Sequence, residues 1–217
     1  MNWKEKVFND FNLYAVTDLK DTKPTILKKV EKAFDGGVDI VQLRSKVLSD
    51  NEMIRIGSAI RTIARTKRKL FFVNDRLDIA LALKSDGLHI GQDDIPVKTV
   101  RSLCRASVTK LFLGKSTHSL KQAVETAREN VDYIGLGPIF ATPTKKDYIP
   151  VGLPLINKVK SRISKPFVTI GGINTKNITE VLDCGATRIA VVRAIFGARD
   201  VLKATQQLKR SIATHAG

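Results

Sequence analysis

The feature that most constrains the fold is an alternation of short apolar runs with amphipathic, helix-like runs, repeated eight times in 217 residues. Apolar runs of four or five residues between turn signals predict buried strands, and the segments between them predict helices. The predicted strands span 13–17, 39–43, 70–73, 88–90, 111–114, 133–136, 167–170 and 188–192. The predicted helices span 24–34, 51–66, 97–105, 120–129, 153–163, 175–183 and a C-terminal segment to about 214, with one short helix between the third and fourth strands.

Two architectures satisfy a strand-helix alternation of this kind. One is a closed (β/α)₈ TIM barrel, and the other is an open, doubly wound parallel sheet. Nearly every predicted strand ends in polar residues, which makes sense if all eight ends surround one site. We therefore predict an α/β protein with a single TIM-barrel domain over residues 1–217, its barrel core spanning about 12–212.

The stretch from Phe71 to Asp94 carries a carboxylate just beyond each of two consecutive strands, Asp75 and Asp94. Parallel strands point the same way, so both side chains are expected at one rim of the barrel. Two carboxylates brought together repel each other unless a cation lies between them, and oxygen ligands suit Mg²⁺. The alternative is that Asp75 caps the following helix and that Asp94 starts a turn before Pro96.

Several polar residues at other strand ends indicate phosphate binding. Gly171-Gly172 follows an apolar strand, where it allows an anion to approach backbone N–H groups closely, although it also fits a plain tight turn. Further donors for phosphate oxygens lie at Lys46, Thr142, Thr144 and Lys145. The loop over residues 141–152 is long for a strand-helix connection, so we expect it to act as a lid.

The net charge of the chain is strongly positive, at +16 from 37 Lys plus Arg and 21 Asp plus Glu. Such a balance fits nucleic acid, an anionic membrane or phosphorylated substrates. The basic residues are dispersed along the predicted outer helix faces, which favours a solvated surface. No apolar run has membrane length and the N-terminus lacks a signal peptide, so we expect a soluble, cytoplasmic protein.

Eight motifs of the sequence are YAVTD at 14–18, VQLRSK at 41–46, VNDR at 73–76, GLHIGQDD at 87–94, GKSTHS at 114–119, DYIGLGPIFATPTK at 132–145, IGGI at 170–173 and GATRIAVVRAI at 185–195. In these motifs, and in their order and spacing, the chain resembles the thiamine phosphate synthases over about 180 of its 217 residues. The resemblance implies a (β/α)₈ barrel that, with Mg²⁺, joins 4-amino-2-methyl-5-hydroxymethylpyrimidine diphosphate to 4-methyl-5-(2-hydroxyethyl)thiazole phosphate and releases pyrophosphate.

The resemblance also implies roles for individual residues. The Mg²⁺ ligands would be Asp75 and Asp94, and the residues acting in catalysis would be Lys46, Ser116 and Lys145. The pyrimidine diphosphate would be bound by Gln42, Arg44, Lys46, Asn74, Ser116 and Lys145, and the thiazole phosphate by Thr142, Thr144, Gly172, Val192 and Arg193. Several members of the family carry a small residue where this chain has Arg193, a departure that a backbone N–H contact would tolerate. His118 stands where the family often has His, and we assign it no catalytic role.

Two alternatives lead to different functions. A thiazole tautomerase has the same barrel without coupling activity, but it lacks the diphosphate and metal residues that are intact here. A nucleic-acid-binding protein would explain the positive charge, yet aromatic residues make up only 6% and no RNA-binding motif is present. We therefore expect small-molecule substrates as partners, with no specific nucleic acid and no membrane, and we leave a homo-oligomer open.

Overall fold

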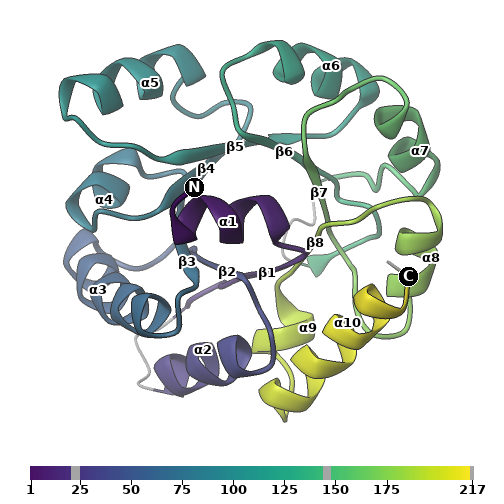
Figure 1. Cartoon of the computed structure of the whole chain (residues 1–217), viewed down its shortest axis with the longest axis horizontal. Coiled ribbons are helices and arrows are strands. Elements are labelled where there is room, and N and C mark those ends of the chain that lie inside the picture. Colours follow the sequence, from purple (N-terminus) through teal and green to yellow (C-terminus); the bar gives the residue numbers. More distant parts are fainter. Residues whose placement is uncertain (21–24, 144–147, 216–217) are drawn as a thin grey trace.

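The eight strands form one closed parallel barrel in a computed structural model that describes residues 1–20, 25–143 and 148–215 (Figure 1). Each strand pairs with the next in the chain, and β1 closes the ring by pairing with β8. The strands are β1 (Leu13–Val16), β2 (Ile40–Leu43), β3 (Leu70–Asn74), β4 (Gly87–Ile90), β5 (Phe112–Thr117), β6 (Tyr133–Leu136), β7 (Phe167–Ile170) and β8 (Ile189–Val191). The predicted barrel is confirmed, and the open sheet is excluded.

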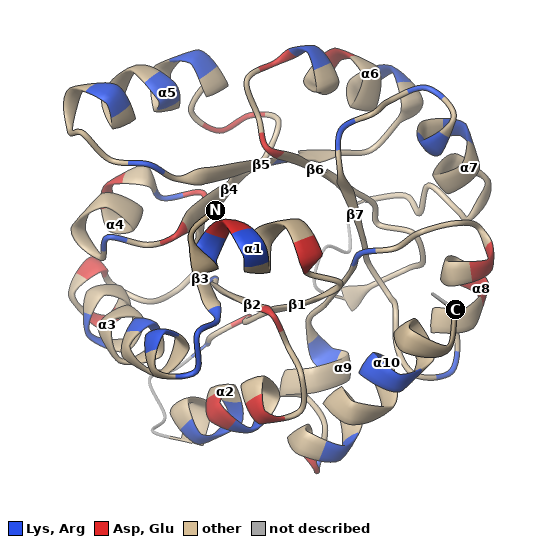
Figure 2. Cartoon of the chain, viewed as in Figure 1, with Lys and Arg blue, Asp and Glu red and all other residues tan. Residues whose placement is uncertain are grey.

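Helices surround the barrel and shield the outer face of the sheet (Figure 1). They are α1 (Trp3–Asp10), α2 (Thr25–Asp35), α3 (Asp50–Thr66), α4 (Leu77–Ala82), α5 (Val97–Ala106), α6 (Leu120–Arg128), α7 (Pro154–Lys160), α8 (Ile178–Asp183), α9 (Arg193–Phe196) and α10 (Val201–His215). Lys and Arg are spread over many of these helices and the segments between them (Figure 2). Within the described ranges, no helix has both the length and the apolar character of a membrane span.

The alternation of side chains along each strand divides the core into two layers. On β1, Leu13 and Ala15 belong to the large cluster between the sheet and the helices, whereas Tyr14 and Val16 belong to a second cluster inside the barrel. Successive side chains of a strand point to opposite faces, so one short strand supplies both layers. The inner layer decides the shape of any site within the ring.

Rings from one strand fill the barrel interior where a neighbouring strand carries glycine. A Cβ added to Gly114 would lie 2.1 Å from Cζ of Tyr133, and one added to Gly87 would lie 2.5 Å from Cζ of Phe72. Real Cβ atoms do not approach other atoms this closely, so both positions require glycine.

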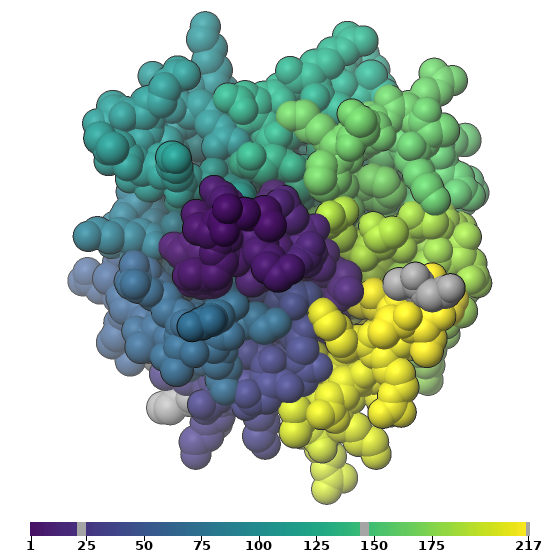
Figure 3. Space-filling model, in the orientation of Figure 1, coloured from purple at the N-terminus to yellow at the C-terminus, as the bar shows by residue number. Residues whose placement is uncertain are grey.

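The sequence reasoning missed α1, which lies across the N-terminal end of the barrel (Figures 1 and 3). A capping box starts this helix, because the Asn2 side chain accepts from Glu5 N–H and the Glu5 side chain accepts from Asn2 N–H. The ring of Phe8 stacks on Phe112 at a centroid distance of 3.9 Å. The helix thereby closes the end of the barrel opposite the predicted site.

The C-terminal part of the chain differs from the expected helices in two places. An Asx turn delays α8 until Ile178, because the Asn177 side chain accepts from Asn174 N–H and the Asn174 side chain accepts from Lys176 N–H. The predicted C-terminal helix is split into α9 and α10, since α9 ends after one turn at its C-cap, Gly197.

An ionic cluster at the N-terminal end of the barrel joins α10 to the sheet. The Asp39 carboxylate accepts from Lys69 Nζ at 2.8 Å and from Lys209 Nζ at 2.7 Å. The same carboxylate accepts from the backbone N–H groups of Asn12 and Leu13 at 3.2 and 3.3 Å. Asp39 is 8% exposed, so these contacts compensate a nearly buried charge.

Candidate functional site

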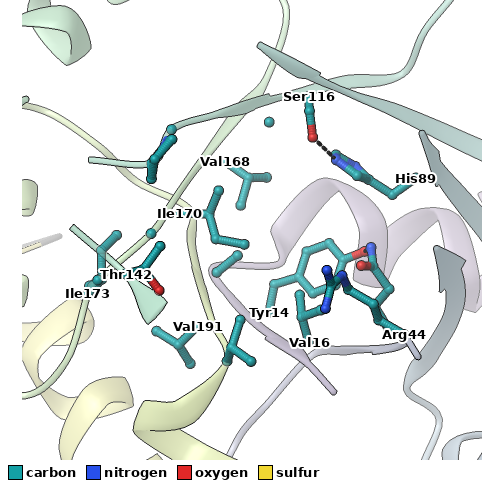
Figure 4. A pocket seen from close by; sticks show the side chains of 18 of the residues that line it. Tyr14, Val16, Arg44, His89, Ser116, Thr142, Val168, Ile170, Ile173 and Val191 are labelled. Carbon is teal, nitrogen blue, oxygen red and sulfur yellow. Dashed lines mark hydrogen bonds between the residues drawn. The ribbon is translucent and has the colours of Figure 1, made fainter. Parts of the chain in front are cut away.

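A cavity of about 330 Å³ lies within the ring and reaches the carboxyl ends of the strands (Figure 4). It collects eight of the residues that the sequence predicts for substrate binding: Gln42, Arg44, Asn74, Ser116, Thr142, Gly172, Val192 and Arg193. Catalytic sites of TIM barrels are built at this end, from loops that follow the strands. These residues, scattered along the sequence, therefore line one cavity, and their roles in binding stay predictions.

One wall of the cavity is apolar. It is formed by Val168 and Ile170 of β7, by Ala190 and Val191 of β8, and by Val16 of β1. Of these side chains, Val168 lies beside Ser116 and His89, and Val191 lies on the side of the cavity away from them (Figure 4). Such a surface suits the faces of flat, weakly polar rings, with orientation supplied by a few polar groups.

A chain of hydrogen bonds crosses the cavity and links five strands. Gln42 Nε2 donates to Tyr14 Oη at 2.6 Å, and the hydroxyls of Tyr14 and Tyr133 lie 3.2 Å apart. His89 bonds through Nδ1 to Tyr133 Oη at 2.9 Å and through Nε2 to Ser116 Oγ at 2.9 Å (Figure 4). Burial raises the pKa of both tyrosine hydroxyls well above the ordinary value, so each keeps its proton.

Arg44 is fixed at the end of β2 by two contacts to β1 and its loop. Its guanidinium forms an ion pair with Asp18, and its backbone N–H donates to Thr17 Oγ1 at 2.8 Å. The Arg44 side chain is only 11% exposed. A pre-oriented guanidinium of this kind suits an anionic group such as a phosphate.

The two predicted metal ligands meet at the rim, beside rather than inside the cavity lining. Asp75 Oδ2 accepts from Lys46 Nζ at 2.8 Å, and Asp94 Oδ2 accepts from Gly91 N–H at 2.6 Å. Burial raises the pKa of Asp94, and the adjacent Asp75 carboxyl raises it further. The hydrogen bond from Gly91 N–H lowers this pKa but does not outweigh the other two effects. The pair is therefore a repulsive one that a cation would stabilise.

The capping alternative for Asp75 does not hold. The N-cap of α4 is Arg76, and no side-chain hydrogen bond caps that helix. Asp75 itself takes a left-handed conformation, with φ at +60°, that turns the chain sharply after β3. For Asp94 the turn is real, since its carboxylate closes the loop back to Gly91. Oδ2 of Asp94 therefore already accepts one hydrogen bond, and Asp75 is paired with Lys46 at the rim.

Two carboxylates alone do not make a complete cage for a metal. Among residues 1–20, 25–143 and 148–215, no group of three or more His, Cys, Asp or Glu side chains could hold an ion. Mg²⁺, however, is commonly held by one or two carboxylates, with water and substrate phosphate oxygens filling its shell. Asp75 and Asp94 fit that pattern in the presence of a diphosphate.

The loops after β7 and β8 have the backbone geometry that the sequence led us to expect for phosphate binding. Gly171 and Gly172 both have positive φ values, +103° and +68°. A Cβ on Gly172 would lie 2.6 Å from Cβ of Phe140, so only glycine allows this close passage of backbone. The short helix α9 begins at Arg193, directly after β8, and barrels commonly bind phosphate between such a helix and the loops after strands seven and eight.

The loop after β6 is only partly described. Thr142 lines the cavity, but two predicted phosphate ligands, Thr144 and Lys145, lie outside the described residues. His118 also lines the cavity, where its Nδ1 bonds to the carbonyl of Gly137 and its ring lies 4.6 Å from that of Tyr148. These contacts tie the far side of the loop to β5, and lid motion stays a prediction.

Tyr14, His89 and Tyr133 are among the cavity residues to which the sequence reasoning assigned no role. Each lies on a strand, where the sequence alone suggests that an aromatic or partly polar side chain belongs to the hydrophobic core and not to a functional site. The two-residue period of a strand could have found two of them, because alternate side chains of a strand share one face. Tyr14 shares the inner face of β1 with Val16, and His89 shares the inner face of β4 with Gly87.

Comparisons with known proteins find chains that are similar over almost the full length. The model of a family described as thiamine monophosphate synthase matches residues 13–195. The chain is similar to the thiamine-phosphate synthases of Pyrococcus abyssi, at 39% identity, and Pyrococcus horikoshii, at 41%, each over 98% of both chains. The solved structure of thiamine phosphate pyrophosphorylase from Pyrococcus furiosus superposes with a TM-score of 0.87 at 36% identity, covering 100% of both chains. A 3-hexulose-6-phosphate synthase, at 20% identity and a TM-score of 0.66, shares the fold.

Proposed function

The chain belongs to the thiamine monophosphate synthase family and is a transferase that makes thiamine phosphate, and from that premise we propose how its residues carry out the reaction. The pyrimidine ring would occupy the cavity between Gln42 and Ser116, with its diphosphate directed to the rim at Lys46, Asp75 and Asp94. The thiazole phosphate would lie across the cavity, at Gly172 and the start of α9.

The observation that supports this assignment is that candidate phosphate ligands lie at two separate places around one small cavity. Arg44 lies at one place, with Lys46 and the carboxylate pair at the rim nearby, and the Gly171-Gly172 turn and the start of α9 lie at the other. A reaction between a ring diphosphate and a ring monophosphate needs this arrangement, because the rings must meet while their phosphates are held apart.

Residues at the rim are assigned to the diphosphate. Asp75 and Asp94 would hold Mg²⁺, which when bound neutralises charge on the diphosphate oxygens. Lys46 already donates to Asp75, so its ammonium lies where a diphosphate would approach the carboxylates. Arg44 after β2, Asn74 on β3 and Ser116 on β5 add donors, and Lys145 stays assigned to the diphosphate by resemblance alone.

The bond change is a substitution at the exocyclic CH₂ of the pyrimidine. The C–O bond breaks with its electron pair leaving on pyrophosphate, and the thiazole nitrogen then forms the new C–N bond. The amino group of the pyrimidine donates electrons to the developing cation, so departure leads and attack follows. The protein's task is to stabilise charge on the leaving group and hold the thiazole in line, and no general base is required.

The test is a coupled assay with both substrates and Mg²⁺ that detects thiamine phosphate, followed by single-turnover rates with a pyrimidine carrying an electron-withdrawing substituent. We expect product in the first assay and a severely slowed chemical step in the second, because the substituent destabilises the cation. Activity that survives EDTA would remove the metal assignment. An unchanged or faster single-turnover rate would replace the dissociative order with direct displacement.

A further inference from the structure

The hydrogen-bond chain across the cavity joins two residues with an assigned role to three without one. Its ends, Gln42 and Ser116, stand in the proposed site for the pyrimidine diphosphate. Its middle members, Tyr14, Tyr133 and His89, come from β1, β6 and β4. Tyr14 and Tyr133 are almost fully buried, at 2% and 1% exposure, so the chain is an internal feature of the barrel.

Proton counting gives this chain a direction. The Gln42 amide nitrogen can only donate, so Tyr14 Oη is its acceptor at 2.6 Å. The arrangement that gives each hydroxyl proton an acceptor within the chain has Tyr14 donating to Tyr133, and Tyr133 donating to His89 Nδ1, across 3.2 and 2.9 Å. In this arrangement His89 carries its hydrogen on Nε2 and donates to Ser116 Oγ at 2.9 Å. The hydroxyl proton of Ser116 is left to point elsewhere.

We infer that Tyr14, Tyr133 and His89 are positioning residues that fix the hydrogen-bond polarity of both chain ends. Gln42 is held with its amide nitrogen on Tyr14, so it presents its carbonyl oxygen, and Ser116 presents its O–H. The cavity therefore demands a donor beside Gln42 and an acceptor beside Ser116.

This polarity deepens the proposed function, on which it rests for the contact between Gln42 and the pyrimidine. A ring amino group donates to the Gln42 carbonyl, whereas an oxo group in its place would set two acceptors against each other in a buried site. The chain thus selects amino-substituted over oxo-substituted pyrimidines, although neither tyrosine needs to touch the amino group.

The first experiment reads the polarity without any substrate, so its outcome does not depend on the proposed function. ¹⁵N-labelled histidine reports which ring nitrogen carries hydrogen, and the chain has only three histidines to assign. We expect the Nε2–H tautomer for His89 in the wild-type protein. Gln42→Glu replaces the donor with an acceptor, so the whole chain should reverse and His89 should change to the Nδ1–H tautomer.

Cutting the chain provides the control for that reversal. Tyr133→Phe removes the link between the two halves, so in a protein that also carries Gln42→Glu the change at His89 should disappear. A wild-type Nδ1–H tautomer would overturn the inference, as would a His89 signal that ignores Gln42→Glu in a protein shown to be folded by its thermal unfolding.

The second experiment measures selectivity in the complete enzyme. Tyr14→Phe frees the Gln42 amide to turn, so the ratio of kcat/KM for the amino pyrimidine diphosphate over its oxo analogue should fall about 10- to 100-fold. Tyr148→Phe is the matched control. Tyr148 is the one tyrosine of the protein outside the hydrogen-bond chain, so loss of its hydroxyl should leave the ratio unchanged. An equal ratio in wild type and Tyr14→Phe would refute the positioning role. A wild type without synthase activity would instead remove the proposed function, while the histidine tautomers would still decide the polarity.

Discussion

Replacement of Asp39 by Asn tests the ionic cluster that joins α10 to the sheet. The carboxylate accepts from Lys69 and Lys209 at 2.8 and 2.7 Å and from two backbone N–H groups. An Asn amide has the same shape but carries one NH₂ group, which would face either a lysine ammonium or the backbone donors. The substitution therefore removes a charge and creates a clash of donors in one step.

The cost of Asp39→Asn follows from burial. Removing one partner of a buried ion pair costs about 3–5 kcal/mol. The side chains of Lys69 and Lys209 are 24% and 32% exposed, and solvent screens part of their interaction. We therefore expect a loss of about 2–3 kcal/mol in the free energy of unfolding at pH 7.

The loss should depend on pH in a defined direction. Burial opposes ionisation of Asp39, but Lys69 and Lys209 outweigh it and lower the pKa of the carboxyl. A lowered pKa in the folded state means that the carboxylate stabilises the protein above the unfolded pKa of about 4, and that this stabilisation is lost as the pH falls through the folded value. The difference between wild type and Asp39→Asn should therefore shrink below about pH 4.

Urea unfolding at pH 7 and pH 3 measures both quantities. Asp35→Asn is the control, because Asp35 pairs with Lys67 but its side chain is 49% exposed, and we expect a cost of at most about 0.5 kcal/mol. Equal costs for the two variants at pH 7, or a cost for Asp39→Asn that stays constant down to pH 3, would refute the reasoning.

Three further predictions concern the site and the barrel interior. Asp75→Asn or Asp94→Asn should lower turnover by orders of magnitude while the far-UV circular dichroism stays unchanged. In the metal-free protein, Asp94→Asn should also raise the free energy of unfolding by about 0.5–1 kcal/mol, because it removes one of two carboxylates that repel each other. Lys46→Ala should cost about 10² to 10³ in single-turnover rate rather than only in substrate affinity, so a pure KM effect would contradict its role at the leaving group. Gly114→Ala, whose Cβ would lie 2.1 Å from Tyr133, should cost about 1–3 kcal/mol in thermal or urea unfolding.

The fold was predictable because short apolar runs typical of strands alternate with segments of helical period along the chain, and this alternation fits a (β/α)₈ barrel. β6 and β7 begin and end at the predicted residues, and most other elements differ by only a few positions. The gathering of Gln42, Asn74 and Ser116 also follows from topology, since the carboxyl ends of parallel strands meet at one rim.

Other parts of the structure depend on contacts that no local pattern encodes. α1 is short, and its burial depends on Phe8 finding Phe112, far along the chain. The hydrogen-bond chain depends on Tyr14 and Tyr133, whose hydroxyls meet only when the ring closes. The sequence offered the Asn2–Glu5 capping box as a sign of the first, but gave no comparable sign of the second.

The position of α1 has a consequence for the order of events during synthesis. The N-terminus leaves the ribosome first, so Phe8 emerges well before Phe112 and Asp39 well before Lys209. β1 likewise waits for β8, the last strand made, before the ring can close. The residues of α1 are therefore buried late, because the β5 ring that Phe8 stacks on and the strand that closes the barrel are both synthesised after it.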